Sequence, residues 1–251
     1  MAIQREEIES IVVEVLSTLS SNAVLASSTV EQGDWGVFEN LDQAVRAATA
    51  AYRQSTTIAL REKIVAVMRT AARDNAKRLA EMAVEETGMG RIEDKTKKNL
   101  LVADRTPGPE VLNPSAITGD TGLTLVENAP WGVIASVTPS TNPAATVINN
   151  AISMISGGNA VVFAPHPAAK RVTQEAIRIM NRAIVAETGI NNLLVCVREP
   201  TIEVAQQLFT QPGINLLVVT GGEAVVEAAR KTTNKRLMAA GAGNPPVVVD
   251  D

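Results

Sequence analysis

The sequence of 251 residues contains few of the side chains that build disulfides, metal sites and base-stacking surfaces. It has one cysteine, Cys196, and one histidine, His166, which excludes an internal disulfide and a zinc site made of cysteine and histidine. Aromatic residues make up 2% of the chain, so platforms for stacking nucleic-acid bases are largely missing. We therefore expect an aliphatic core, no bound metal, and a ligand held mainly by backbone and small polar groups.

The sequence also lacks a basic excess and a long apolar run. Its 23 lysine and arginine residues against 27 aspartate and glutamate residues do not create the positive field that a phosphate backbone or an anionic lipid surface requires. Its apolar runs, such as 193–197 and 216–219, are far shorter than the roughly 20 residues that cross a bilayer. The first residues lack the apolar core and cleavage site of a secretory signal. We expect a cytoplasmic protein with no nucleic-acid partner and no membrane partner.

Residues 1–19 carry apolar side chains at helical spacings of three and four, which predicts a short amphipathic helix. The polar and small-residue stretch 20–33 has no periodicity and predicts a flexible linker. Such a helix either docks on its own domain or acts as a detachable recognition peptide, and the linker favours the second alternative. The apolar positions are Ile8, Ile11, Val12, Val15, Leu16 and Leu19.

Residues 34–106 predict a helical front to the domain that follows. Apolar and alanine positions keep helical spacing over 40–87, which predicts two or three helices, and a further helix is predicted over 92–104. In this last helix, a solvated, charged face and not a phosphate site is predicted for Glu93, Asp94, Lys95, Lys97 and Lys98.

The remainder of the chain predicts β-structure of two kinds. Alternating residues predict an antiparallel β-hairpin arm over 115–133, and such an arm often meets another subunit. From residue 133 onward, short apolar runs separated by helical segments predict an α/β fold with a Rossmann-like parallel sheet and crossover helices. The strands are predicted at 133–137, 160–163, 193–197, 214–219 and 247–249, and the helices at 143–155, 168–187, 201–211 and 223–232.

The ends of these strands predict where a ligand binds. In open α/β sheets the ligand lies beyond the carboxyl ends of the strands, which selects residues 138–142, 164–167 and 220–223. The dinucleotide fingerprint Gly-x-Gly-x-x-Gly is absent, because Gly241-Ala242-Gly243 begins like one but is followed by an asparagine and two prolines. The only tyrosine, Tyr52, lies in the helical front, which excludes the pattern of a short-chain dehydrogenase.

Several segments resemble a different family of nicotinamide-dependent enzymes. The stretch 130–143 is similar to the strand of the aldehyde dehydrogenase superfamily that leads into an asparagine-containing turn, and 158–167 is similar to that superfamily's second cofactor strand. Val219-Thr220-Gly221-Gly222 is similar to its phosphate-side turn. The motifs Ser-Thr-Asn-Pro, Ala-Pro-His-Pro, Thr-Gly-Gly and Gly-Ala-Gly-Asn-Pro-Pro together resemble the coenzyme-A-acylating branch found in ethanolamine and propanediol utilization. The resemblance covers nearly the whole chain.

The resemblance implies roles for eight residues. In this family a side-chain amide and a backbone N–H stabilise the negative charge that develops on the aldehyde oxygen, and Asn142 matches the amide; the alternative is a helix N-cap. Gly221 and Gly222 would let the following helix approach the cofactor pyrophosphate, against the alternative of a simple tight turn. His166 is either a surface histidine or a cofactor contact. The implied cofactor-binding residues are Thr138, Pro139, Ser140, Pro165, His166, Gly221 and Gly222.

The implied activity is NAD-dependent oxidation of a short aldehyde, acetaldehyde being the best guess, to acyl-CoA through a cysteine thioester, with coenzyme A as co-substrate. Hydrolytic members carry a glutamate base near the segment 237–241, where this sequence has no carboxylate, which favours acyl transfer to a thiol. Ala164 and Pro167 replace the lysine and carboxylate that hydrolytic members carry, so NADP stays open as the cofactor. The competing hypotheses are a non-catalytic binding or assembly module and a hydrolytic aldehyde dehydrogenase.

The family's nucleophilic cysteine lies downstream of Asp251, and Cys196 is expected to be an inert, buried thiol. We therefore expect a truncated chain in which 34–251 form a nucleotide-binding domain, the catalytic domain is absent, and activity is absent in isolation. Residues 1–19 resemble the short peptide that directs enzymes of this branch into a bacterial microcompartment. This implies shell or cargo proteins as partners and a location inside a microcompartment, and the family implies a homo-oligomer at full length.

Overall fold

The structure is a computed structural model that describes residues 33–55, 57–241, 243 and 246–249. The predicted amphipathic helix at 1–19, and the predicted linker at 20–33 apart from its last residue, lie outside the described residues. In the part of the chain that is described, no helix combines the length and the apolar character needed to cross a membrane. The same part contains no group of three or more histidine, cysteine, aspartate or glutamate side chains placed to hold a metal ion.

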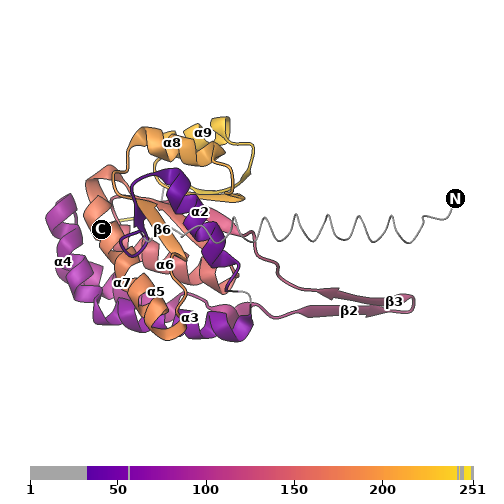
Figure 1. The fold of residues 1–251 in the computed structure, drawn as a ribbon. Coiled ribbons are helices and arrows are strands. Elements are labelled where there is room, and N and C mark those ends of the chain that lie inside the picture. The colour runs from indigo at the N-terminus through magenta and orange to yellow at the C-terminus, as the bar shows by residue number, and fades with distance from the viewer. Residues whose placement is uncertain (1–32, 56, 242, 244–245, 250–251) are drawn as a thin grey trace, which may run out of the picture. The chain divides into compact units, whose positions relative to one another are not determined.

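A six-stranded parallel sheet forms the centre of the domain (Figure 1). Short, mostly apolar runs form its central strands because these strands are covered on both faces, and every residue of β4, β5 and β6 is buried. The predicted α/β fold with a Rossmann-like parallel sheet is confirmed. The strands of this sheet are β1 (Val37–Phe38), β4 (Val133–Val137), β5 (Ala160–Ala164), β6 (Leu194–Val197), β7 (Leu216–Thr220) and β8 (Arg236–Ala240).

The order of the strands across the sheet is β1-β6-β5-β4-β7-β8. From β4 the chain proceeds through β5 to β6 in one direction, and then returns to form β7 and β8 on the other side of β4. Right-handed crossovers therefore place the helices after β4 and β5 on one face, and the helices after β6 and β7 on the opposite face. The two directions meet between β4 and β7, and in open α/β sheets the ligand binds at such a switch point.

Helices cover the sheet and form a further outer layer. Helices α6 and α7 follow β4 and β5, α8 and α9 follow β6 and β7, and α2 packs on β4, β5 and β6. Helices α3, α4 and α5 pack against α6 and α7 and lie far from α8 and α9 in Figure 1. The bounds are α2 Leu41–Tyr52, α3 Ile58–Asp74, α4 Ala76–Thr87, α5 Ile92–Arg105, α6 Pro143–Ser156, α7 Lys170–Thr188, α8 Ile202–Thr210 and α9 Glu223–Thr232, with short 3-10 helices at Pro109–Val111 and Pro167–Ala169.

The predicted hairpin arm is present and projects from the body of the domain (Figure 1). Its strands β2 (Ser115–Gly119) and β3 (Gly122–Val126) pair antiparallel, with Ala116 opposite Leu125. All residues of both strands are exposed, including apolar side chains that a free hairpin would not display. The arm therefore presents an uncovered apolar surface.

The prediction of a last strand at 247–249 is wrong. The strand that completes the sheet is β8, which pairs with β7 from Arg236 opposite Leu216 to Ala240 opposite Thr220. The valines at 247–249 have high β-propensity, but they follow two prolines and are 82–93% exposed. A strand at the edge needs no continuous apolar run, and four of the five residues of β8 are exposed, so its sequence signal is weak. The two-residue β1 was also missed, since its length gives no periodicity.

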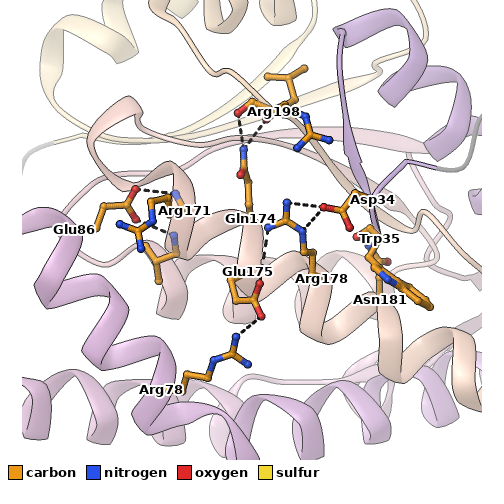
Figure 2. Close-up of polar contacts among 12 residues, drawn as sticks. Asp34, Trp35, Arg78, Glu86, Arg171, Gln174, Glu175, Arg178, Asn181 and Arg198 are labelled. Atoms are coloured by element: carbon orange, nitrogen blue, oxygen red, sulfur yellow. Dashed lines mark hydrogen bonds and ion pairs between the residues drawn. The ribbon is translucent and has the colours of Figure 1, made fainter.

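Polar side chains on α7 connect this helix to the sheet and to the start of the domain, as Figure 2 shows. Gln174 Nε2 donates to the backbone oxygens of Val197 and Arg198, which follow one another at the end of β6. Asn181 Nδ2 donates to the backbone oxygens of Trp35 and Leu194, at 2.8 and 2.6 Å. These hydrogen bonds fix β1 and β6 against α7, and they satisfy backbone groups at the ends of the strands.

Candidate functional site

Three turns meet at the carboxyl edge of the sheet. Strands β4, β5 and β7 end level with one another, because Val137 lies opposite both Ala164 and Val219 in the parallel register. The turns that follow these strands are 138–142, 165–167 and 221–222, and each leads into a helix. Residues far apart in the sequence are therefore brought to one site by the register of the sheet.

The turns surround a cleft of about 790 Å³ that also extends along α8 and α9. Its walls are mostly apolar or small, and His166 is the one titratable side chain among the residues that line it in the described part of the chain. No carboxylate from these described residues therefore faces the cleft to activate water. All eight residues predicted for the site line this one cleft: Thr138, Pro139, Ser140, Asn142, Pro165, His166, Gly221 and Gly222.

Thr138 stabilises the wall of the cleft through hydrogen bonds between two strands. Its side chain is buried, and both its backbone N–H and its Oγ1 donate to the backbone oxygen of Ala164, at 3.1 and 3.3 Å. A second contact stabilises β4 from the helix that follows it, because Asn150 Nδ2 donates to Ser136 Oγ at 2.9 Å. The hydroxyl of Thr138 therefore shapes the cleft by joining the ends of β4 and β5.

Asn142 occupies the N-cap position of α6, but its side chain makes no capping hydrogen bond. Instead, Asn142 Oδ1 accepts a hydrogen bond from Lys98 Nζ on α5, at 3.0 Å. The N-cap alternative is therefore correct for the position of this residue and wrong for its bonding. Pro143 begins the helix, as a residue without an N–H group can.

The prediction of a solvated, charged face on α5 is confirmed for Glu93, Lys97 and Lys98, which are exposed, and is wrong for Lys95. Lys95 is only 8% exposed, and its Nζ donates to the backbone oxygen of Thr141 at 2.7 Å. Burial, followed by the neighbouring charge of Lys98, lowers the pKa of Lys95 below its ordinary value. The three-residue spacing shows that both lysines share one face of α5, but the sequence does not show that this face meets the turn at 138–142.

The turn after β5 is organised by His166. Its Nδ1 accepts a hydrogen bond from the backbone N–H of Ala168 at 3.1 Å, so a neutral imidazole carries its proton on Nε2. The start of α7 is occupied by a carboxylate, since the two oxygens of Glu86 accept the N–H groups of Arg171 and Val172, both at 2.8 Å (Figure 2). The positive end of α7 is therefore already neutralised and does not offer a phosphate site.

The turn after β7 carries no side-chain cap. Gly222 is the N-cap of α9, whose first turn contains Glu223, and the N–H of Val225 donates to the backbone oxygen of Gly222 at 3.1 Å. The N–H groups of Glu223 and Ala224 are left at the start of the helix, and Ala224 lines the cleft. Neither glycine is required by backbone conformation or by packing: a methyl group at Gly222 would meet no atom within 4 Å, and one at Gly221 would make ordinary contact with Val225 at 3.8 Å. The absence of side chains leaves space for a ligand beside the helix terminus.

Cys196 is not among the residues that line this cleft, and it lies on β6, the second strand from one edge of the sheet. It is fully buried on β6, where its backbone pairs with β1 and β5. Burial raises the pKa of its thiol to about 12, and two nearby arginines offset this only in part. The expectation of a buried thiol is confirmed, and its lack of reactivity stays a prediction.

Comparison with known proteins shows a family relationship along the whole domain. Residues 27–251 match the model of the aldehyde dehydrogenase family. The chain is 60% identical to the acetylating acetaldehyde dehydrogenase EutE of Escherichia coli over 247 residues, which covers 98% of this chain and 52% of that protein. The chain thus spans about half the length of the curated relatives it matches.

Solved structures share the fold. A propionaldehyde dehydrogenase from the fucose utilisation bacterial microcompartment of Clostridium phytofermentans has a TM-score of 0.82 and 44% identity, covering 84% of this chain and 49% of that one. An engineered glycolyl-CoA reductase with bound NADP+ has a TM-score of 0.83 and 44% identity, covering 86% of this chain and 50% of that one. On the match of its sequence, the chain belongs to the aldehyde dehydrogenase family.

Proposed function

We propose that this chain forms the cofactor-binding half of an enzyme that oxidises a short aldehyde, acetaldehyde in the first instance, to acyl-CoA. The observation that supports this most directly is that eight residues from three separate turns line one cleft at the carboxyl edge of the sheet. Its relatives are acylating aldehyde dehydrogenases, and a structural neighbour binds NADP+. We propose NAD as the cofactor and NADP as the alternative, with coenzyme A as co-substrate.

The three turns would have distinct tasks in this cleft. The N–H groups of Glu223 and Ala224 at the start of α9, beside Gly221 and Gly222, would bind the pyrophosphate, because a helix N-terminus attracts anions. The turn with Pro165 and His166 would contact the adenosine ribose. A bound nicotinamide accepts a hydride from the substrate, and residues 138–140 would form the wall against which it lies.

Asn142 would stabilise the reacting oxygen. Attack of a thiol on an aldehyde places negative charge on the former carbonyl oxygen, and an amide N–H directed at this atom lowers the energy of the transition state. Cys196 does not supply the thiol, because it is buried and its pKa is raised to about 12. We propose that the nucleophilic cysteine belongs to the catalytic half that full-length members of the family possess.

Acyl transfer to a thiol is favoured over hydrolysis by the composition of the cleft. The described lining residues provide no carboxylate, whereas activation of water against a thioester requires a general base.

We further propose that the hairpin arm, with its exposed apolar residues, binds another copy of the protein in a homo-oligomer. Residues 1–19 are proposed to direct the enzyme to shell or cargo proteins of a bacterial microcompartment, which is the setting of one structural neighbour.

Titration of the chain with NAD+ tests the cleft directly, with calorimetry as the measurement. A carboxylate placed beside the start of α9 by Gly222→Glu would repel the pyrophosphate, so binding should weaken at least about tenfold, the equivalent of about 1.4 kcal/mol. Gly119→Glu is the matched control, because this glycine of the hairpin also has no atom within 4 Å of an added methyl group. Equal affinity in the two variants, or no binding by the folded chain up to about 1 mM NAD+ and NADP+, would contradict the proposal.

An activity measurement distinguishes the proposed acylating enzyme from a non-catalytic assembly module. The chain is joined to the second half of EutE from Escherichia coli, with which its own half is 60% identical. We expect NADH formation from acetaldehyde that depends on coenzyme A and yields acetyl-CoA. Acetate as the product, without a requirement for coenzyme A, would instead favour a hydrolytic dehydrogenase.

A further inference from the structure

Two lysines of α5 hold the turn that carries Asn142. Lys95 Nζ donates to the backbone oxygen of Thr141 at 2.7 Å, and Lys98 Nζ donates to Asn142 Oδ1 at 3.0 Å. The two donors lie one turn apart on the same face of the helix and contact consecutive residues. The turn at the cleft is therefore fixed from outside the sheet, by the helical front of the domain.

The helix that carries these lysines is itself firmly held. Asn99 Nδ2, buried between the helices, donates to the backbone oxygen of Ala76 at 2.9 Å. The guanidinium of Arg69 donates to the backbone oxygens of Ala103 and Thr106, both at 2.6 Å, at the end of α5. Because α5 is tied to α4 and α3 in this way, the lysine ammonium groups have defined positions relative to the cleft.

The contact with Lys98 determines which way the Asn142 amide faces. An ammonium group has donors and no acceptor, so the amide oxygen must be directed at it. The amide is planar and its nitrogen lies on the other branch, so the two N–H donors are directed away from Lys98. Asn142 also lines the cleft, which makes its Nδ2 the atom able to donate a hydrogen bond there. The positive charge near Oδ1 polarises the amide and strengthens its N–H groups as donors.

Without Lys98 the same side chain has a competing partner. Asn142 is the N-cap of α6, and an asparagine at that position commonly accepts N–H groups of the first helical turn through its oxygen. That arrangement would rotate the amide and change the direction of Nδ2. The observed structure has the lysine contact and no capping hydrogen bond.

We propose that Lys98 is a positioning residue, which holds Asn142 Oδ1 away from the start of α6 so that Nδ2 faces the reacting oxygen, while Lys95 fixes the adjoining Thr141 carbonyl. This inference rests on the proposed role of Asn142 in aldehyde oxidation. It predicts that loss of the Lys98 ammonium weakens transition-state stabilisation without weakening the fold, because the released amide can cap α6 instead.

The first measurement is made on the 251-residue chain by NMR. The side-chain NH2 signals of Asn142 are identified by their loss in Asn142→Ala. We expect Lys98→Met to shift these signals, Lys98→Arg to shift them less, and the control Lys97→Met, at the neighbouring exposed lysine of α5, to leave them in place. Unchanged Asn142 signals in Lys98→Met would overturn the proposal. A fall in the unfolding midpoint of Lys98→Met well beyond that of Lys97→Met would assign Lys98 to structure and also overturn it.

The second measurement uses the chain joined to the second half of EutE. Asn142→Ala should lower kcat at least about 100-fold, as for loss of an oxyanion donor, and Lys98→Met about tenfold with KM for NAD+ nearly unchanged. Lys98→Met added to Asn142→Ala should cause no further loss, because the lysine acts through the asparagine. Full activity of Asn142→Ala would refute the proposed role of Asn142. Loss of activity in Asn142→Ala together with full activity in Lys98→Met would refute only the positioning role.

Discussion

The guanidinium of Arg178, on α7, lies 2.8 Å from the carboxylate of Asp34 and connects the longest helix of the domain to the residues just before β1 (Figure 2). The same guanidinium lies 3.8 Å from Glu175, which in turn contacts Arg78 of α4 at 2.8 Å. Arg178 is 16% exposed, so its charge is shielded from water more than that of a surface arginine. This pair is one of the long-range contacts that hold the edge of the sheet.

Arg178→Met is therefore expected to destabilise the chain. It leaves the carboxylate of Asp34 without this cation, whereas Glu175 keeps Arg78, and we expect the free energy of unfolding to fall by about 1–3 kcal/mol. Urea denaturation followed by circular dichroism gives this value. The control is Arg230→Met, because Arg230 pairs with Glu227 on the surface of α9, where an ion pair contributes at most about 1 kcal/mol. A loss no larger than that of the control would contradict the structural role.

Cys196 should be unreactive in the folded chain. Its thiol is buried and its pKa is raised to about 12, so neither thiolate nor access is available near neutral pH. We expect a thiol reagent to label the chain at pH 8 only after denaturant is added, and the enzyme formed with a catalytic half to keep its activity in Cys196→Ala. Rapid labelling under native conditions, or loss of activity in a folded Cys196→Ala protein, would make this cysteine a candidate nucleophile.

The same thiol predicts a pH dependence of stability. The thiol of the unfolded chain ionises near its ordinary pKa of 9.0, whereas burial raises the pKa of the folded thiol to about 12. Between these values the folded state binds more protons, so the contribution of Cys196 to the free energy of unfolding falls as pH rises, by up to about 1.4 kcal/mol per pH unit. This contribution is complete below pH 9 and should be absent in Cys196→Ala. Parallel stability curves for the two proteins between pH 8 and 10.5 would contradict the assignment.

The segment 1–19 is expected to act as a targeting peptide. Each large aliphatic side chain buried in an apolar groove contributes at most roughly 1.5–3 kcal/mol, so several must act together to offset the ordering of a free peptide. Residues 1–20 fused to a fluorescent protein should form foci in cells that make microcompartments, whereas Ile11→Glu and Leu16→Glu versions should be diffuse. Equal distribution of the three fusions would instead favour a helix that docks on its own domain.

Local patterns in the sequence determined the elements that are covered on both faces or have clear end signals. Mostly apolar runs predicted β4 to β7, because a strand covered on both faces has few polar residues. Pro143 marked the start of α6, since proline fits the first helical position. The turns that follow β4, β5 and β7 then selected the residues of the cleft.

Only the tertiary structure decided which elements meet. The edge strands β1 and β8 form through pairing with β6 and β7, and neither needs an apolar pattern of its own. The charged face of α5 looks solvated in sequence, yet packing of α5 on α6 buries Lys95 and brings Lys98 to Asn142. A spacing of three residues places two lysines on one face of a helix. Their hydrogen-bond partners lie more than 40 residues away in the chain, so only the fold brings each lysine close to its partner.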